Sequence, residues 1–362
     1  MRVPTFIGRS ILAWLALLPL YAAASPFSGL YVVGDSLSDQ GNLFAATSVL
    51  GPTYGLPAIP ASDHYFQGRF SNGEIYAGVL AGRLGLGLSN SLSGGNNFAF
   101  GGTRTDYNTV EVRPGEGVYP RGAYPWTLNL QRDAFSARVA ISGVDPHALF
   151  VVFSGSNDVS DILRRRLNPA TVIPNAVAGI RSVIEAFKAA GAETVLVPNL
   201  PDLGVVPRIT QLEASNPGIS ALATALTRQY NLALDNMLSA ESGIRIIRFD
   251  TFSFLDDVVA HPGNYGLLNA TGPCFSGFVD PAPTGTVCAT PDAYAFWDVE
   301  HPTRALHAAL ADKMFLAVSV PEPAESTLLV LGLVAMVLAR VRPSLRGSLR
   351  RIQCRTRWSL PS

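Results

Sequence analysis

Residues 30–39 read Leu-Tyr-Val-Val-Gly-Asp-Ser-Leu-Ser-Asp, an apolar run that ends in a polar turn. A short continuous apolar run is typical of a strand that is buried on both faces. The chain contains three more runs of this kind, at residues 149–153, 194–197 and 244–249. We therefore predict four buried strands, the first of which ends just before the polar turn.

Between these runs, apolar residues recur at the spacing of one helix face. The first such stripe is followed by Gly191, which suits a helix C-cap. The three stripes are Val177, Ile180, Ile184 and Phe187; Leu222, Leu226, Leu234 and Met237; and Leu306, Leu310, Met314 and Ala317. We interpret all three as core faces. Strands that alternate with helices predict an α/β fold with a mostly parallel sheet covered on both faces.

The composition permits one large globular domain or two small ones, since 48% of the 362 residues are hydrophobic. The net charge of zero hides an asymmetry, because nine of the 27 basic residues but only two of the 27 acidic ones lie before residue 25 or after residue 320. The central part therefore carries 18 basic and 25 acidic side chains. This balance argues against nucleic acid as a partner, because phosphate binding requires a basic surface.

The first 24 residues have the features of a secretory signal peptide. Arg2 and Arg9 form the basic start, residues 11–20 the apolar centre, and residues 22–24, all alanine, the cleavage site. We expect export through the Sec pathway with cleavage after Ala24. The alternative is an uncleaved membrane anchor, for which the apolar stretch is short.

The three cysteines differ in meaning. Cys274 and Cys288 close a short loop, and in an exported domain we expect a disulfide between them. Cys354 stands alone in the basic tail. No cysteine–histidine spacing indicates a zinc site, so we expect no bound metal.

Ser36 follows the first predicted strand, in the segment Gly-Asp-Ser-Leu. Catalytic groups in open α/β sheets lie beyond the carboxyl ends of the strands, which is where Ser36 falls. If a helix started just after it, the Ser36 N–H would point toward an oxyanion formed nearby. Gly-Asp-Ser alone is a weak signal, since such tripeptides often cap helices.

Asp298 and His301 lie three residues apart in the segment Trp-Asp-Val-Glu-His-Pro-Thr, residues 297–303. A serine hydroxyl becomes a good nucleophile when an imidazole accepts its proton, and the imidazole needs a carboxylate on its other nitrogen. Asp298 and His301 can supply that pair from one tight turn. The alternative interpretation is that Asp298 caps a helix starting near Pro302 and that His301 is a surface residue.

Two further segments offer hydrogen-bond donors to an oxyanion. Gly101 and Gly102 follow Asn-Phe-Ala-Phe, and a glycine N–H can approach a ligand closely. Asn157 follows the second predicted strand in Gly-Ser-Asn-Asp, and its amide can donate as well. Each segment alone could be a turn, although a tetrahedral intermediate needs two or three converging donors.

Taken in order, these motifs resemble the SGNH/GDSL hydrolase family over residues 30 to about 317. The four family blocks match here at Ser36, at Gly101, at Asn157, and at Asp298 with His301. Supporting segments at 68–73, 199–204 and 296–298 are similar to the family's longer, plant-lipase-like branch. The resemblance implies a three-layer α/β/α, flavodoxin-like fold over residues 25–319, with no metal and no organic cofactor.

For the reaction, the resemblance implies an exported serine esterase or lipase that forms an acyl-enzyme. Ser36 would be the nucleophile, His301 the general base and Asp298 the residue that orients it. The Ser36 N–H, the Gly101 N–H and the Asn157 side chain would bind the oxyanion, with Gly102 as the alternative to Gly101. The rival functions are an esterase that removes acetyl groups from envelope or extracellular polysaccharide, and a non-catalytic surface-binding module.

The C-terminal segment 320–342 resembles a PEP-CTERM sorting signal of Gram-negative bacteria. It contains Val-Pro-Glu-Pro, an apolar run at 327–339 and then arginines. The resemblance implies membrane insertion, processing by an exosortase-type enzyme, and a final location at the cell envelope or outside the cell. A basic tail, 343–362, follows where such signals usually stop. A simple C-terminal membrane anchor is the alternative.

Other polar residues receive structural interpretations. We expect His64, His147, His261 and His307 to be surface or hydrogen-bonded histidines, and residues 164–166, all arginine, to form a solvated face. Asp39 and Asn42 are expected to hold the turn after Ser36.

Overall fold

The structure is a computed structural model that describes residues 26–54, 58–60, 62–105, 126–279 and 285–319. The predicted signal peptide, the predicted sorting signal, the basic tail and Cys354 lie outside the described residues. Within those residues, no helix is both long enough and apolar enough to cross a membrane.

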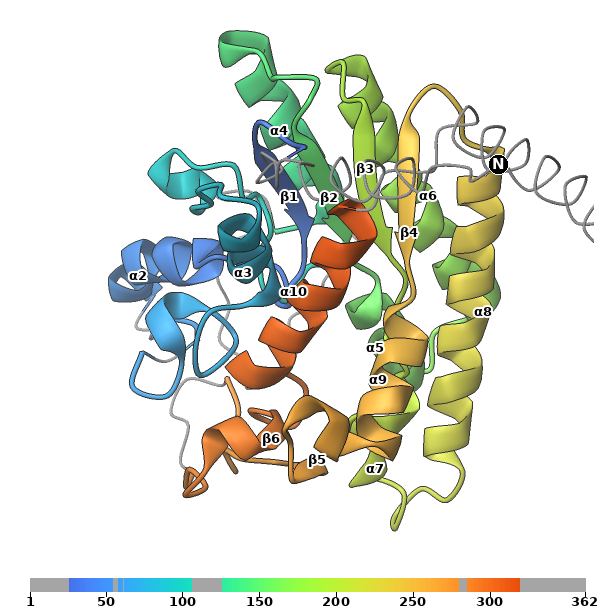
Figure 1. Ribbon diagram of the computed structural model, residues 1–362. Coiled ribbons are helices and arrows are strands. Elements are labelled where there is room, and N and C mark those ends of the chain that lie inside the picture. Colours follow the sequence, from blue (N-terminus) through green and yellow to red (C-terminus); the bar gives the residue numbers. More distant parts are fainter. Residues whose placement is uncertain (1–25, 55–57, 61, 106–125, 280–284, 320–362) are drawn as a thin grey trace, which may run out of the picture. The chain divides into compact units, whose positions relative to one another are not determined.

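Four parallel strands lie side by side in chain order (Figure 1). They are β1 (Leu30–Gly34), β2 (Leu149–Phe153), β3 (Thr194–Pro198) and β4 (Arg245–Phe249). The strands start level with one another, since Leu149 pairs with Leu30 on one side and with Thr194 on the other. The four predicted strands are confirmed to within one residue at each end, and their carboxyl ends meet at one edge.

A fifth segment, residues 96–100, runs parallel to β1 on its free side. The Val32 N–H donates to the Asn96 carbonyl at 3.1 Å, and the Phe98 N–H donates to the Val32 carbonyl at 2.7 Å. The sheet order is therefore this segment, β1, β2, β3 and β4, which is the flavodoxin-like order 2-1-3-4-5. This pairing brings Gly101 and Gly102 to the same edge as Ser36.

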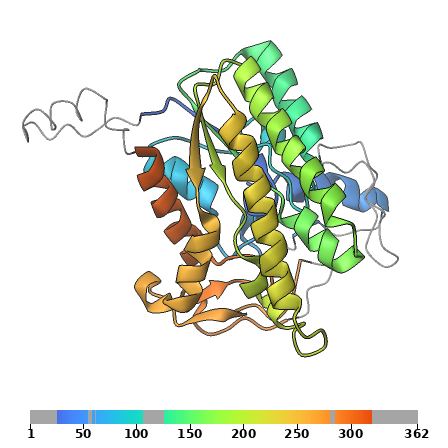
Figure 2. The same cartoon turned by 90° about the vertical axis from the view of Figure 1, so that its right-hand side faces the viewer.

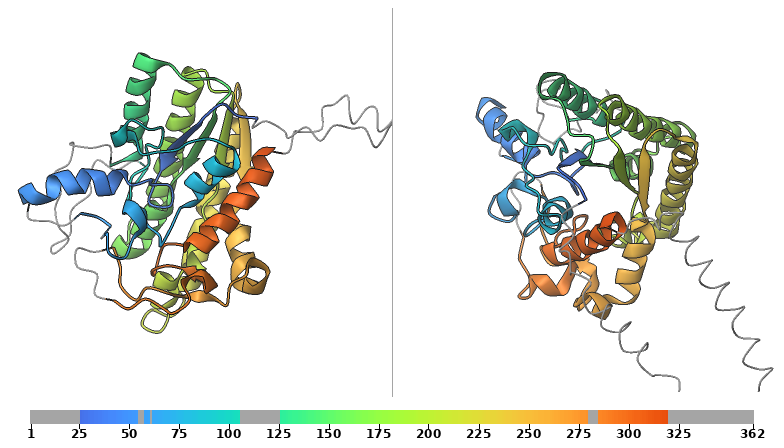
Figure 3. Two further views of the ribbon diagram at one scale, coloured as in Figure 1. Left: turned by 60° about the vertical axis from the view of Figure 1, so that its left-hand side comes forward. Right: turned by 45° about the horizontal axis from the view of Figure 1, so that its top comes forward.

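Helices cover both faces of the sheet, which confirms the predicted three-layer arrangement (Figures 1, 2 and 3). One face carries α4 (Leu128–Ser142), α6 (Pro169–Ala189) and α8 (Ile219–Ala240). The other face carries α3 (Tyr76–Arg83), α9 (Thr251–Ala260) and α10 (Arg304–Ser319). Every residue of β2 and β3 is buried, because both strands lie between the two helical layers.

The predicted stripe on α6 is a core face, and Gly191 follows α6 with a φ of +90°. The stripe on α10 is a core face up to Met314, after which Val318 is buried in place of the half-buried Ala317. The stripe predicted on α8 is partly wrong, because Leu222 is 50% exposed. Helix α8 instead turns a face with a regular spacing of four residues toward the sheet. Its buried members are Leu226, Tyr230, Leu234 and Leu238.

The remaining elements lie mostly around the carboxyl edge of the sheet. They include the helices α2 (Asn42–Tyr54), α5 (Ser156–Arg165) and α7 (Pro207–Thr210). Short 3₁₀ turns lie in the connections at Phe66–Gly68, Ser91–Ser93, Leu203–Val205, Pro262–Tyr265 and Pro291–Ala293. Strands β5 (Asn269–Pro273) and β6 (Tyr294–Phe296) form a second, two-stranded parallel sheet. Strand β6 leads into the segment that carries Asp298 and His301.

Candidate active site

Ser36 lies in a tight turn at the carboxyl edge of the sheet, just beyond the end of β1. The Asp35 carboxylate accepts a hydrogen bond from the Leu37 N–H at 3.1 Å, and the Asp35 carbonyl accepts one from the Ser38 N–H at 3.0 Å. Helix α2 begins only at Asn42, so no helix starts directly after Ser36. The turn alone sets the direction of the Ser36 N–H, for which no acceptor exists among the described residues.

Asp298 and His301 lie in a closed turn between β6 and α10. Asp298 Oδ1 accepts hydrogen bonds from the N–H groups of Glu300 and His301, each at 2.8 Å. The same turn places His301 Nδ1 2.8 Å from Asp298 Oδ2, which also accepts a hydrogen bond from the Tyr65 hydroxyl at 2.6 Å. Helix α10 begins at Arg304 and His301 is buried, so the alternative of a helix cap with a surface histidine does not hold.

The chain brings these two motifs together. The Ser36 hydroxyl donates to His301 Nε2 across 3.1 Å, although the residues are 265 positions apart. Ser36, His301 and Asp298 therefore form one hydrogen-bonded row. In this row a proton can pass from the serine to the imidazole while the carboxylate holds the other ring nitrogen.

The environment of this row fixes its charge states. Burial by itself raises the pKa of Asp298, but His301 and the donors Tyr65 and Glu300 N–H outweigh burial and hold the pKa below its ordinary value. Burial by itself lowers the pKa of His301, but the Asp298 charge and hydrogen bond outweigh it and raise the pKa. Asp298 therefore stays ionised and keeps the proton of His301 on Nδ1, which leaves Nε2 free to accept the Ser36 proton.

Asn157 stands near the start of α5, at the end of β2. Its Nδ2 donates one hydrogen bond to the Thr103 carbonyl at 2.9 Å, so one N–H of the amide remains for a ligand. Gly155 makes this approach possible, because its φ is +126° and a Cβ there would lie 2.4 Å from the Tyr230 hydroxyl oxygen. Asn157 lines the same cavity as Ser36 and His301.

The structure corrects the expectation for Gly101. Its N–H donates to Asp39 Oδ2 at 2.8 Å, and a Cβ on it would lie 2.2 Å from Phe70 Cζ. Gly101 is therefore a packing residue whose N–H is already used. The N–H of the exposed Gly102 has no acceptor among the described residues. Asp39 also binds the N–H groups of residues 41–43, so it holds the turn as expected, while burial raises its pKa to about 6.

Comparison with known proteins identifies the family of this chain. Residues 30–314 match the family described as GDSL-like lipase/acylhydrolase. The chain belongs to this family. Esterase EstA of Pseudomonas aeruginosa is 29% identical and aligns with 89% of this chain and 51% of its own length, so the chain spans about half the length of that relative. A GDSL esterase/lipase of Arabidopsis thaliana is 26% identical, with 79% of this chain and 85% of that protein covered.

Among solved structures, the acetylxylan esterase Axe2 from Geobacillus stearothermophilus matches with a TM-score of 0.42 and 13% identity. The match covers 81% of this chain and 94% of that chain.

Several residues that pack around the imidazole of His301 were not predicted from the sequence. The His301 ring has Phe70 on one side at 5.1 Å between ring centroids and Phe278 stacked on it at 5.9 Å. The guanidinium of Arg208 lies 4.2 Å from the centre of the Phe278 ring and pairs with Glu300 at 2.6 Å. These contacts restrict the imidazole to one orientation. Of the residues in these contacts, only Glu300 could be associated with His301 from the sequence, because it is the preceding residue in the chain.

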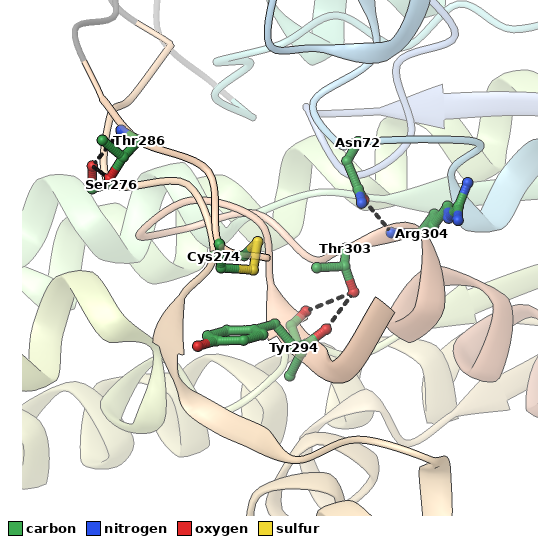
Figure 4. The surroundings of a disulfide bond; sticks show 9 residues. Asn72, Cys274, Ser276, Thr286, Tyr294, Thr303 and Arg304 are labelled. Atoms are coloured by element: carbon green, nitrogen blue, oxygen red, sulfur yellow. Dashed lines mark hydrogen bonds between the residues drawn. A yellow bond between two sulfur atoms is a disulfide. The ribbon is translucent and has the colours of Figure 1, made fainter. Parts of the chain in front are cut away.

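The predicted disulfide joins Cys274 to Cys288 (Figure 4). The Cys274 N–H donates to the Phe296 carbonyl at 3.0 Å, and the next N–H, of Phe275, donates to the Trp297 carbonyl at 2.6 Å. The Phe275 ring stacks on Trp297 with 5.5 Å between ring centroids. The disulfide loop is thus hydrogen-bonded to the segment that leads directly into Asp298.

We expect removal of this disulfide to destabilise the fold. Replacing Cys274 and Cys288 together by serine should lower the free energy of unfolding by about 3 kcal/mol, because the bond closes a loop with a separation of 14 residues. Urea unfolding under non-reducing conditions measures the change. Cys354→Ser is the matched control, since Cys354 takes no part in this bond, and equal stability of the double variant and the control would contradict the prediction.

The other histidines fall into two groups. His147 and His261 are exposed and lie beside the carboxylates of Glu193 and Asp257, as expected. His64 lies 3.1 Å from Asp63, but its Nδ1 makes no hydrogen bond among the described residues and its ring stacks on Phe275, so the expectation does not hold for His64. The expectation for His307 is wrong, because it is fully buried and neither ring nitrogen has a hydrogen-bond partner among the described residues. Burial lowers the pKa of His307 to about 3, so it remains neutral.

Two further expectations concern the three consecutive arginines and metal binding. Arg164 and Arg166 are exposed, which agrees with a solvated face, while Arg165 lies 3.5 Å from Asp161. In the part of the chain that the structure describes, no group of three or more histidine, cysteine, aspartate or glutamate residues is placed to hold a metal ion.

Proposed function

We propose that this protein hydrolyses carboxylic esters through an acyl-enzyme formed on Ser36. The observation that carries the proposal is the row in which the Ser36 hydroxyl meets His301 Nε2 at 3.1 Å and His301 Nδ1 meets Asp298 at 2.8 Å. Membership of the GDSL-like lipase/acylhydrolase family supports it. A non-catalytic module would have no need of an activated serine beside a free amide N–H.

The reaction has two halves. In the first, Ser36 Oγ bonds to the ester carbonyl carbon while its proton moves to His301 Nε2, and the C–O bond to the alcohol then breaks as the alcohol takes that proton. In the second, water bonds to the acyl carbon and gives a proton to His301. The bond to Ser36 Oγ then breaks, the serine recovers the proton, and the carboxylic acid leaves.

The negative charge on the carbonyl oxygen needs fixed donors in both halves. The proposal assigns this role to the N–H groups of Ser36 and Gly102 and to the Asn157 amide. Gly102 takes the place of Gly101, because the Gly101 N–H is bound to Asp39. The hydrogen bond from Asn157 to Thr103 joins the second and third donors into one unit.

Asn157→Ala is expected to lower kcat for a p-nitrophenyl ester by about 10²- to 10³-fold, because one oxyanion donor is lost. KM should change little, since the donor acts on charge that develops in the transition state. Steady-state kinetics of the purified variant measure both values. A tenfold rise in KM with an unchanged kcat would show that Asn157 binds the ground state only and would remove it from the oxyanion site.

Titration with a serine-reactive phosphonate tests the proposal itself. We expect one phosphonyl group per chain, attached to the peptide that contains Ser36, and loss of ester hydrolysis in step with labelling. Labelling at another serine, or a chain that neither labels nor hydrolyses esters, would overturn the assignment.

The proposal includes export. Residues 1–24 have the composition of a signal peptide, and a disulfide such as Cys274–Cys288 is typical of oxidising compartments outside the cytoplasm. Segment 320–342 would then retain the protein at the envelope until it is processed. The N-terminal sequence of the protein from its native host should begin at Ser25, and an N-terminus at residue 1 on a cytoplasmic protein would refute export.

A further inference from the structure

A cavity of about 100 Å³ opens beside the three residues Ser36, Asn157 and His301. Beyond them most of its lining is apolar and comes from β2, α7, α9 and α10. Polar side chains also line it, those of Asp35, Ser156, Ser160, Arg208, Thr251 and Glu300. The main wall residues are Phe153, Ile209, Phe254, Leu255, Leu306 and Leu310. Each of these side chains is at most 9% exposed, so the cavity reaches into the core and is not a groove on the surface.

Two long charged side chains also line the cavity, and they neutralise each other. Arg208 Nε lies 2.6 Å from Glu300 Oε1, and the Arg208 N–H donates to the Val299 carbonyl at 2.8 Å. Arg208 therefore offers no unpaired charge to a substrate. The cavity suits an uncharged, apolar group.

We infer that this cavity binds the acyl chain of the ester, and that it prefers a saturated chain of about four carbons. The inference rests on the proposed function and adds the substrate class to it. A cavity of about 150 Å³ with leucine, isoleucine and phenylalanine walls holds one benzene molecule, so about two thirds of that volume has room for about four carbons.

The order of departure in the reaction identifies the acyl arm of the ester as the occupant. The acyl chain and the alcohol oxygen are both bonded to the carbon that bears the oxyanion, so an ester whose oxyanion meets Asn157 places one of its two arms at the cavity that Asn157 lines. The alcohol has to leave before water can attack the acyl-enzyme. A deep cavity with a mostly apolar lining would hold the alcohol back, whereas the acyl chain stays there until the second half of the reaction.

Helix α10 forms one wall along the length of the cavity. His301 and Pro302 precede the helix at the site, Leu306 follows in its first turn, and Leu310 lies one turn, about 6 Å, further along. Leu310 therefore stands at the far end of this wall. Its side chain limits the length of the acyl chain that can be bound.

The first test is a chain-length series on the full-length protein. With p-nitrophenol as the constant leaving group, kcat/KM should rise about fourfold per methylene from acetate to butyrate and gain nothing further with longer acyl chains. In a second series, acetate esters of alcohols of increasing length should show no comparable rise. A maximum at acetate, a steady rise to dodecanoate, or a rise only in the alcohol series would overturn the inference.

The second test changes the end of the cavity. Leu310→Ala should raise the ratio of kcat/KM for octanoate to that for butyrate by about tenfold, because it makes room for two to three more methylenes. Leu316→Ala is the matched control, since Leu316 lies on the same helix and is 58% exposed. If Leu310→Ala fails to fold, Leu310→Phe should shift the preference toward acetate. The same shift in the control, or no shift in the folded variant, would refute the role of Leu310.

Failure of this inference can be told apart from failure of the proposed function. A chain that reacts with phosphonate at Ser36 but has a flat chain-length profile keeps its catalytic assignment and loses the acyl cavity. A chain that takes no phosphonate and hydrolyses no member of either series loses both.

Discussion

Ser36→Ala is expected to lower kcat/KM for p-nitrophenyl butyrate by about 10⁵- to 10⁶-fold. The variant loses the atom that forms the acyl-enzyme, and no other serine hydroxyl in the described residues donates to His301 Nε2. Some acceleration over the uncatalysed reaction should remain, since Asn157 and the backbone donors still bind the oxyanion. Kinetics of the wild-type protein, with its active sites counted by phosphonate titration, and of the variant, with its concentration taken from absorbance, give the ratio; phosphonate labelling of the variant preparation measures any wild-type contamination.

The fold should not change with this substitution. The Ser36 side chain is only half-buried, and its one hydrogen bond within the described residues is to His301. The thermal midpoint of the variant should therefore stay within a few degrees of the wild-type value. Ser48→Ala is the matched control, because Ser48 is an exposed serine on α2, and it should keep full activity. More than 1% residual activity in a clean Ser36→Ala preparation is incompatible with the mechanism.

The strands could be predicted because they are buried on both faces. Residues 149–153 and 194–198 are apolar at nearly every position, as a strand between two helical layers has to be. Residues 96–100 escaped prediction because only a few backbone hydrogen bonds join them to β1 and because the stretch begins with two asparagines. The exposed Leu222 shows that helical spacing alone does not tell which side of a long helix meets the core.

The residues of the triad could be predicted because they lie in short blocks whose chemistry is local. Gly101 could not be distinguished from Gly102 in this way, because the acceptor that captures the Gly101 N–H is Asp39, which lies 62 positions away. Tyr65 and Phe278 have no sequence signal either. They reach Asp298 and His301 only through the packing of separate loops.

The burial of His307 could not be predicted from the sequence either. From its position in α10 alone, His307 could lie on either side of the helix. In the structure its side chain is fully buried, and its ring stacks on Tyr76 at 6.4 Å between ring centroids. Composition could not reveal that an ionisable residue occupies the core. Its pKa, lowered by burial, keeps it uncharged there.

Asp298→Asn is expected to lower kcat by about 10⁴-fold, because an asparagine amide can donate to His301 Nδ1 and so leave the proton on Nε2, where the Ser36 proton has to go. Tyr65→Phe removes only one of the donors to Asp298 and should cost far less. Asp292→Asn is the matched control, since that exposed carboxylate pairs with Arg304 and should leave kcat unchanged.

The pH profile separates this role from a merely structural one. In the wild-type protein, activity requires neutral His301 and should be lost as the pH falls through the pKa of His301, which burial lowers but Asp298 raises by more. Without the carboxylate, burial is the largest remaining influence and is opposed only by the smaller effect of the Glu300 charge, so the pKa of His301 falls. The acid limb of kcat/KM in Asp298→Asn should therefore move to lower pH. If the limb stays at its wild-type position, the carboxylate does not set the charge of His301, and the residue acts only by shaping the turn.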